Sequence, residues 1–127
     1  MPATIIDGKV IVVSDLEDVS GTTPVTLVTC MPENTKFVIR KLFIYNKDTA
    51  AHEVIVGSYD TTGGSWSTDK IITKVAAGQT VALGPDDLPA DFVITTDSDT
   101  AKMAWAAKLD AAVTANAVKV KVEFELV

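Results

Sequence analysis

His52 is the residue best suited to acid–base chemistry, and it is the single histidine of the chain. A catalytic triad places a histidine between a nucleophile and a carboxylate. His52 follows Ala50 and Ala51 in a predicted turn, with no nucleophile motif near it in the sequence, so we predict a solvated side chain. The chain also contains no HExxH, GxSxG, P-loop or GxGxxG motif. The sequence therefore predicts a protein without enzymatic activity.

The single cysteine, Cys30, offers little further chemistry. One cysteine forms no intrachain disulfide, and it cannot supply a multi-cysteine metal site. Cys30 alternates with Val28 in a predicted strand, and a cysteine in such a position is usually a buried, unreactive thiol. We therefore predict that Cys30 packs in the interior.

Carboxylates gather in two predicted loops, Asp86 and Asp87 with Asp91 in the first, and Asp97 with Asp99 in the second. Carboxylates two residues apart in a loop can share a calcium ion. The later oxygens and the terminal glutamate of an EF-hand are missing here, and turn formation alone explains aspartates at these positions. We predict no bound metal and no cofactor.

Trp66 is the candidate contact residue in the polar, glycine-bearing segment 60–69. A tryptophan flanked by glycine and serine can stack on a sugar ring or fill a pocket of a protein partner. Alternatively, its side chain folds back over the edge of the β-structure. The residues alone leave both interpretations open.

The composition predicts one folded domain and excludes several partners. The 127 residues are 47% hydrophobic and 22% charged, as is typical of a globular protein. Lysine and arginine total 11 against 17 aspartates and glutamates, and the net charge of -6 argues against nucleic acid as a partner. No apolar run approaches the roughly 20 residues that cross a bilayer, and the N-terminus lacks a secretory signal. We expect no membrane partner and synthesis in a cytoplasm.

The segment 37–45 is the centre of the predicted fold. Read with the two-residue period of a strand, its odd-numbered and even-numbered residues are both largely apolar, which is typical of a strand covered on both faces. Residues 118–126 instead alternate strictly, with an apolar inner set and a charged outer set. Further strands are predicted at 25–30, 53–59, 70–75, 80–83 and 91–96. Eight or nine short strands separated by turn signals predict an all-β, antiparallel sandwich.

The segment 101–113 fits both a helix and a strand. Its alanines favour a helix, on which Trp105, Leu109 and Val113 would share a face. As a strand, it points Met103, Trp105 and Leu109 inward and Ala106, among others, outward. Because every neighbouring segment is a predicted strand, we predict a strand here as well.

The N-terminal residues are less clearly tied to the sandwich. Residues 4–13 form a strand or a hairpin folded at Asp7-Gly8, and a loop of different composition follows to Pro24. We predict an N-terminal arm and loop over 1–24 and the β-sandwich domain over 25–127. Such an arm adds itself to the sheet edge of a neighbouring subunit, whereas an edge strand of the same sandwich explains the apolar pattern equally well. The candidate contacts are Ile5, Ile6, Val10 and Val12.

From residue 37 onward the order of features resembles small jelly-roll modules in virion proteins of tailed bacteriophages. The likeness lies in "VIRKLFIYNKDTAAHEVIVGSYD", in "VAAGQTVALGP" and in the closing pair "TDSDTAKMAWAAKL" and "ANAVKVKVEFEL". The resemblance implies a jelly-roll-like sandwich and a non-enzymatic capsid decoration protein on the outside of a phage head. It also implies a homotrimer, contacts with the major capsid protein or another virion protein, and location in a virion assembled in the host cytoplasm. The alternative is a receptor- or carbohydrate-binding module of a tail or fibre, with Trp66 in its site.

Overall fold

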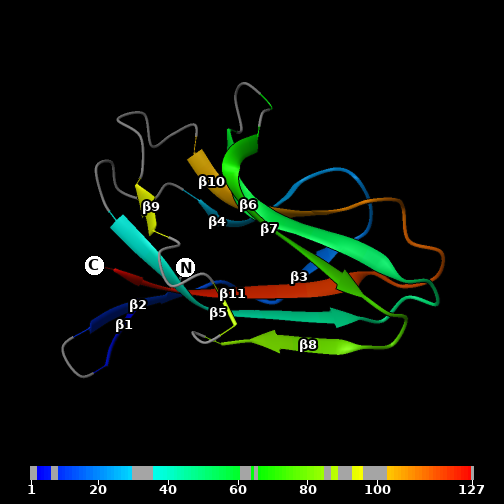
Figure 1. The fold of residues 1–127 in the computed structure, drawn as a ribbon, viewed down its shortest axis with the longest axis horizontal. Coiled ribbons are helices and arrows are strands. Elements are labelled where there is room, and N and C mark those ends of the chain that lie inside the picture. Colours follow the sequence, from blue (N-terminus) through cyan, green and yellow to red (C-terminus); the bar gives the residue numbers. More distant parts are fainter. Residues whose placement is uncertain are drawn as a thin grey trace.

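The computed structural model describes residues 3–6, 9–29, 36–60, 64, 66–84, 87–88, 93–95 and 103–126. The regular elements of these residues are β-strands, arranged as two stacked sheets (Figure 1). No helix in the described part of the chain is long and apolar enough to cross a membrane.

The larger sheet holds seven strands and the smaller sheet four, and every pairing is antiparallel. The larger sheet consists of β1 (Ala3–Ile6), β2 (Lys9–Val13), β3 (Glu17–Val19), β5 (Lys36–Asn46), β8 (Thr80–Leu83), β9 (Val93–Thr95) and β11 (Val118–Leu126). The smaller sheet consists of β4 (Val25–Thr29), β6 (His52–Asp60), β7 (Trp66–Val75) and β10 (Met103–Leu109).

The strand pairing is that of a jelly roll. The strands β2, β4, β5 and β6 pair in reverse order with the later strands β7, β8, β10 and β11, as β2–β11, β4–β10, β5–β8 and β6–β7. Such nesting arises when one long antiparallel ribbon folds over into two sheets, and it gives the two Greek keys of the jelly roll. The predicted all-β jelly-roll sandwich is thereby confirmed. The described residues contain eleven strands rather than eight or nine, because the segment 4–13 forms the two strands β1 and β2 and because β3 was not predicted.

The core lies between the sheets and contains the inner set of β11. Val118, Val120, Val122 and Phe124 are at most 1% exposed, as their alternation with charged residues predicts. The segment 103–109 is a strand, which confirms the choice of strand over helix. Trp105 of β10 meets Phe124 edge to face across the interior, with ring centroids 4.9 Å apart and the rings inclined by 72°.

Burial along β10 does not follow the alternation of its side chains. The predicted outward residue Ala106 is fully buried, like its neighbours Trp105 and Ala107. β10 is an inner strand of the smaller sheet, where Ala106 lies between Thr26 of β4 and Gly57 of β6. The Ala106 methyl group points away from the core but is covered by the two flanking strands. The alternation of inward and outward side chains is therefore not visible in the burial of this residue.

A bulge in β5 changes which of its residues face inward. Ile39 pairs with Phe124 and Lys41 with Glu123, so Arg40 is an extra residue relative to β11. As a result Ile39 and Leu42 both lie in the core, although a regular two-residue period would put them on opposite faces. Both alternating sets of β5 are apolar because the inward-facing set changes at Arg40, and not because the strand is covered on both faces.

The N-terminal residues join the larger sheet of the same chain. β1 pairs with β2, and both β2 and β3 pair with β11. Ile11 of β2 is 1% exposed and Val19 of β3 is fully buried. Ser14 continues this pairing, because its amide donates to the Val122 carbonyl and its hydroxyl accepts from the Val122 amide, both at 2.9 Å. The division between 1–24 and 25–127 stays a prediction.

Candidate functional site

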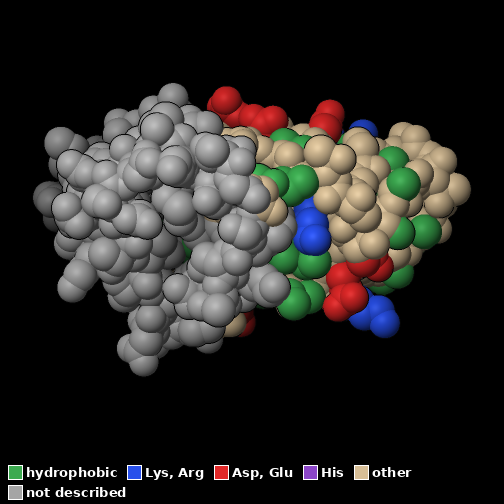
Figure 2. Space-filling view, turned by 90° about the horizontal axis from the view of Figure 1, so that it is seen from above, with side chains coloured by type: hydrophobic (Ala, Val, Ile, Leu, Met, Phe, Trp, Pro, Cys, Tyr) green, Lys and Arg blue, Asp and Glu red, His purple; other side chains and the backbone are tan. Residues whose placement is uncertain are grey.

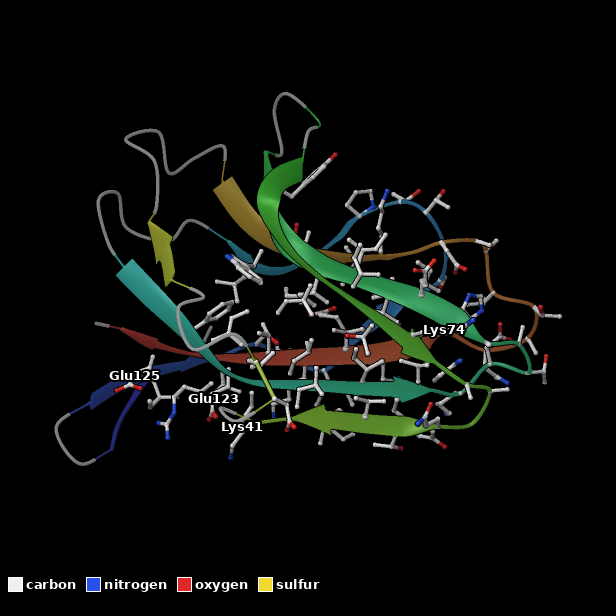
Figure 3. The ribbon with its side chains drawn as sticks, in the orientation of Figure 1. Lys41, Lys74, Glu123 and Glu125 are labelled. Carbon is white, nitrogen blue, oxygen red and sulfur yellow. The ribbon has the colours of Figure 1, made fainter. Side chains whose placement is uncertain are left out.

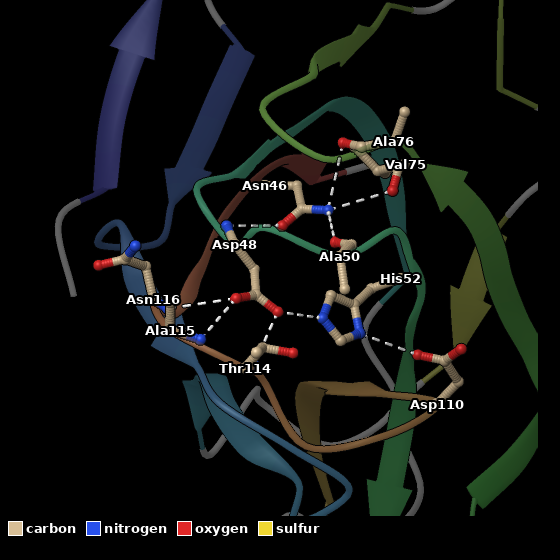
Figure 4. A network of polar contacts seen from close by, with 10 residues as sticks. All are labelled: Asn46, Asp48, Ala50, His52, Val75, Ala76, Asp110, Thr114, Ala115 and Asn116. Carbon is tan, nitrogen blue, oxygen red and sulfur yellow. Dashed lines mark hydrogen bonds and ion pairs between the residues drawn. The ribbon is translucent and has the colours of Figure 1, made fainter.

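His52 lies in a buried polar cluster, not in solvent, and the prediction of a solvated side chain was wrong. The side chain is 3% exposed. Its Nε2 is 2.7 Å from Oδ2 of Asp48, and its Nδ1 is 3.1 Å from Oδ1 of Asp110 (Figure 4). Asp48 lies in the turn between β5 and β6, and Asp110 follows β10. The ring therefore links two connections that are distant in sequence.

Asp48 anchors the loop between β10 and β11. Its carboxylate accepts backbone hydrogen bonds from Thr114, Ala115 and Asn116, at 2.9, 2.8 and 3.3 Å. These amides have no partner in a regular ladder, so a buried carboxylate is a suitable acceptor for them. The aspartate is 2% exposed, and its charge is offset by these donors and by His52.

Asn46 extends the cluster to a third connection. Its side-chain amide donates to the carbonyls of Ala50, Val75 and Ala76, at 2.9, 3.1 and 3.2 Å. Its side-chain oxygen accepts from the amide of Asp48 at 3.0 Å. Asn46 thus joins the turn after β5 to the end of β7, and Figure 4 shows the cluster from close by.

The cluster shifts the pKa values of all three ionisable side chains. The hydrogen bond from His52 and then that from the Thr114 amide hold the pKa of Asp48 far below its usual range. Burial acts to lower the pKa of His52, but the bonds to Asp48 and Asp110 outweigh it and raise that pKa above 6.5. Burial acts to raise the pKa of Asp110, and the bond from His52 outweighs it, so this pKa is lowered.

This geometry is suited to holding loops rather than to proton transfer. A general base needs a ring nitrogen within reach of the group that it deprotonates. Both ring nitrogens of His52 already contact carboxylates, and neither is free for a nucleophile. Among the residues that the structure describes, no group of three His, Cys, Asp or Glu side chains is placed to hold a metal ion.

The outer face of the larger sheet carries the second candidate site. Beyond the bulge, Lys41, Phe43 and Tyr45 of β5 alternate with the core residues and point away from the smaller sheet. Tyr45 is 37% exposed, and Leu16, between β2 and β3, is 48% exposed. We call these four residues together with Lys121 the outer patch.

Two depressions lie side by side on the outer patch, with Lys41 and Phe43 in both. The larger has a volume of about 400 Å³ and is lined by Val13, Leu16, Lys41, Phe43, Lys121, Val122 and Glu123. The smaller has a volume of about 310 Å³ and is lined by Lys41, Leu42, Phe43, Ala82, Leu83 and Gly84. Phe43 and Lys41 form the wall between the two depressions. Aromatic side chains are enriched in protein–protein interfaces.

Charges on this face are arranged in pairs across β5 and β11. Lys41 lies 3.9 Å from Glu123, and Arg40 lies 3.8 Å from Glu125 (Figure 3). Cross-strand ion pairs at a protein surface contribute little to the free energy of unfolding. Exchanging them for ion pairs with a partner protein would therefore cost the fold little. Lys121 is exposed opposite Phe43, which places a cation beside the aromatic ring.

The outer face of the smaller sheet has a different character. Figure 2 views the molecule from this side and shows acidic side chains toward the margins, with apolar ones and a basic one between them. Ile72 of β7 is 54% exposed, the most exposed large hydrophobic side chain in the described part. Among the described side chains of this sheet it is the one large apolar residue that is exposed, and single residues of this kind are common on protein surfaces.

The structure places the predicted contact residues on two separate sheets. Ile5 pairs with Val10, and Val12 pairs with both Ala3 and Phe124, all in the larger sheet. Ile6 pairs with Lys9 at the end of β1. Trp66 begins β7 in the smaller sheet, opposite Tyr59. These side chains lie outside the described part, so their role as contact residues stays a prediction. Cys30, Asp86, Asp91, Asp97 and Asp99 also lie outside the described residues.

The residues of both observed sites were missed for different reasons. Asp48 and His52 are four apart across a turn, a spacing that could have suggested their contact. Asp110 is 58 residues from His52, and no local pattern connects them. Phe43 was assigned to a strand covered on both sides, and only the bulge at Arg40 shows that it faces outward.

Comparison with known proteins gives only distant structural likeness. No protein-family model matches the sequence, and no curated protein matches it. Among solved structures, the chain is similar to a chain from the cryo-EM structure of the virus-like particle of extra small virus from the giant freshwater prawn Macrobrachium rosenbergii. The two are 14% identical with a TM-score of 0.39, over 98% of this chain and 83% of that chain.

Proposed function

We propose that the protein is a structural component of a virion, and more specifically a capsid decoration protein on the head of a tailed phage. The proposal rests on the resemblance of residues 37–126 to phage virion modules and on the jelly-roll pairing. Jelly rolls recur in viral capsid proteins and in lectins, and fold alone does not choose between such functions. The choice of a structural role rests on the outer patch of the larger sheet.

The single observation that carries the proposal is the outer patch. A sandwich of two sheets needs to bury only one face of each sheet. Phe43, Tyr45 and Leu16 therefore add nothing to the core, yet they form an apolar surface with two depressions. Aromatic side chains on a sheet face are typical of the centre of a protein interface.

The first partner of the outer patch is a second copy of this chain. The protein carries a net charge of -6, whereas the patch presents Lys41 and Lys121 around its apolar side chains. Glu123 lies beside Lys41 on the same patch, so the local charge is mixed, and acidic side chains of a second copy can pair with Lys121 while its apolar residues fill the depressions. The homotrimer is part of this proposal and comes from the resemblance, as do contacts with the major capsid protein.

Cryo-electron microscopy of the phage particle that carries this gene tests the function. We expect jelly-roll density on the outside of the head, arranged as trimers, with the outer patch at the contact between copies. Absence of the chain from purified particles contradicts the proposal. Density at a tail fibre, together with glycan-array binding that Trp66→Ala abolishes, would instead identify a carbohydrate-binding module.

A further inference from the structure

We propose that His52 is a pH-dependent latch, which as an imidazolium ties the start of the loop 110–117, at Asp110, to the turn between β5 and β6 and releases it when the ring loses a proton. The inference is independent of the proposed virion function. It rests on the contacts of one ring with two carboxylates, each from a different connection of the fold.

The geometry requires a charged ring. Ionised carboxylates only accept hydrogen bonds, and a neutral imidazole has a single N–H to donate. His52 contacts Asp48 through Nε2 at 2.7 Å and Asp110 through Nδ1 at 3.1 Å. Both contacts are hydrogen bonds only when both nitrogens carry protons. Loss of one proton leaves a nitrogen lone pair facing a carboxylate oxygen.

The contact that breaks on deprotonation is the one with Asp110. Asp48 is buried, it is held by backbone amides of the loop, and its distance to the ring is the shorter. The remaining ring proton therefore stays on Nε2. Asp110 has a side chain that is 42% exposed, so its carboxylate can turn toward water. The start of the loop is released while Asp48 keeps its bonds to Thr114 and Ala115.

No other described charge replaces the two carboxylates around the ring. Asp48 comes from the turn after β5 and Asp110 from the loop after β10. Glu53 follows His52 along β6 and so points to the opposite face, and its cross-strand partner is Lys74 of β7. Of the other charged residues on these elements, Lys47, Glu53 and Lys74 are exposed to solvent, and Lys108 of β10 is half-buried opposite Ile55 of β6.

The released segment is held by few other bonds. Asp110 donates its amide to the Glu53 carbonyl at 3.1 Å, and Val113 donates to the Ser20 carbonyl at 2.9 Å. Residues 110–112 and 114–116 are exposed, so little burial opposes their movement. The raised pKa of His52 places the transition above the ordinary value of 6.5.

Nuclear magnetic resonance of the 15N-labelled full chain tests the latch, and the single histidine makes its ring signals unambiguous. We expect both ring nitrogens to be protonated at pH 6, with a titration midpoint above 6.5. Amide protection factors of residues 110–113, corrected for the intrinsic pH effect, should fall at least about tenfold across that midpoint, which corresponds to about one pKa unit of coupling. Those of 118–124 should stay constant.

Asp110→Asn is the matched variant, because it keeps the side-chain size and removes the charge that the ring faces. We expect a lower titration midpoint and a loop that is already less protected at pH 6. A single protonated nitrogen at pH 6, a midpoint at or below 6.5, or loop protection unchanged through the titration would each overturn the proposal. Glu53→Gln serves as the control and should leave the midpoint in place.

Discussion

Trp105 and Phe124 connect the two sheets through one contact between large side chains. Each is fully buried, and the rings meet at 4.9 Å from strands of opposite sheets. At the residue scale, stability therefore depends on side chains that fill the space between the layers, because interiors are close-packed. The polar cluster around His52 has a different role, since it fixes connections rather than filling volume.

Phe124→Ala should destabilise the fold by about 3–5 kcal/mol, because it leaves a cavity beside Trp105. Urea denaturation followed by tryptophan fluorescence measures the change. The surface variant Ile72→Ala is the control and should change stability by no more than about 0.5 kcal/mol. Equal effects of the two variants would show that Phe124 is not in the core.

Stability should fall as pH rises above neutrality. The folded-state pKa of His52 is above its unfolded value, so its contribution is complete below about 6.5 and is lost as pH rises through the folded pKa. The contribution of Asp48 has the opposite direction, since its lowered pKa stabilises the fold above about 3.9 and is lost on acidification. Thermal melting between pH 4 and 9 should show a maximum on the acid side of neutrality.

His52→Gln is the variant that checks this assignment. Glutamine does not titrate, so the decline in melting temperature between pH 6.5 and 9 should become shallower than in the natural protein. An unchanged alkaline slope would mean that another group is responsible for it.

At the element scale, β11 is the strand on which the larger sheet depends. It pairs with β2, β3 and β5, and Ser14 extends its pairing with the N-terminal segment. β1 pairs with β2 alone in the described structure and lies at the sheet edge. We therefore expect the fold to require β11 and its partner strands, whereas β1 is the edge strand that a neighbouring molecule could reach.

Two deletions distinguish these parts of the N-terminal region. Removal of Met1 to Gly8 deletes β1 only, and we expect thermal unfolding to stay cooperative with soluble protein. Removal of Met1 to Asp18 tests the predicted independence of the sandwich from Val25 onward. Soluble, cooperative protein that no longer assembles would support the arm, whereas insoluble protein would show that β11 requires the cover of β2 and β3.

The sequence predicts elements whose pattern is local and misses those set by distant partners. The strict alternation of 118–126 identifies β11, because one face is solvated and the other is buried. In β5 the extra residue Arg40 shifts the phase, and only the pairing with β11 reveals it. β3 is three residues long, with a single buried side chain, Val19, and such a strand has no recognisable period. The site around His52 depends on Asp110, whose proximity follows from the jelly-roll topology.

At the scale of the whole molecule, the jelly roll presents two unlike outer faces. The larger sheet carries the outer patch with its two depressions, whereas among the described side chains of the smaller sheet Ile72 is the one large apolar residue that is exposed. The loops that the polar cluster holds lie at one end of the sandwich (Figure 1). Assembly through the larger sheet would therefore leave the smaller sheet and these loops accessible.

The molar mass in solution tests the role of the outer patch most directly. Size-exclusion chromatography with light scattering at micromolar concentration should give three times the 13.5 kDa of one chain. Phe43→Ser should shift the mass toward one chain, while Ile72→Ser, a matched change on the other sheet, should leave it unchanged. A natural protein with the mass of one chain, or a Phe43→Ser variant that assembles like the natural protein, would contradict the account.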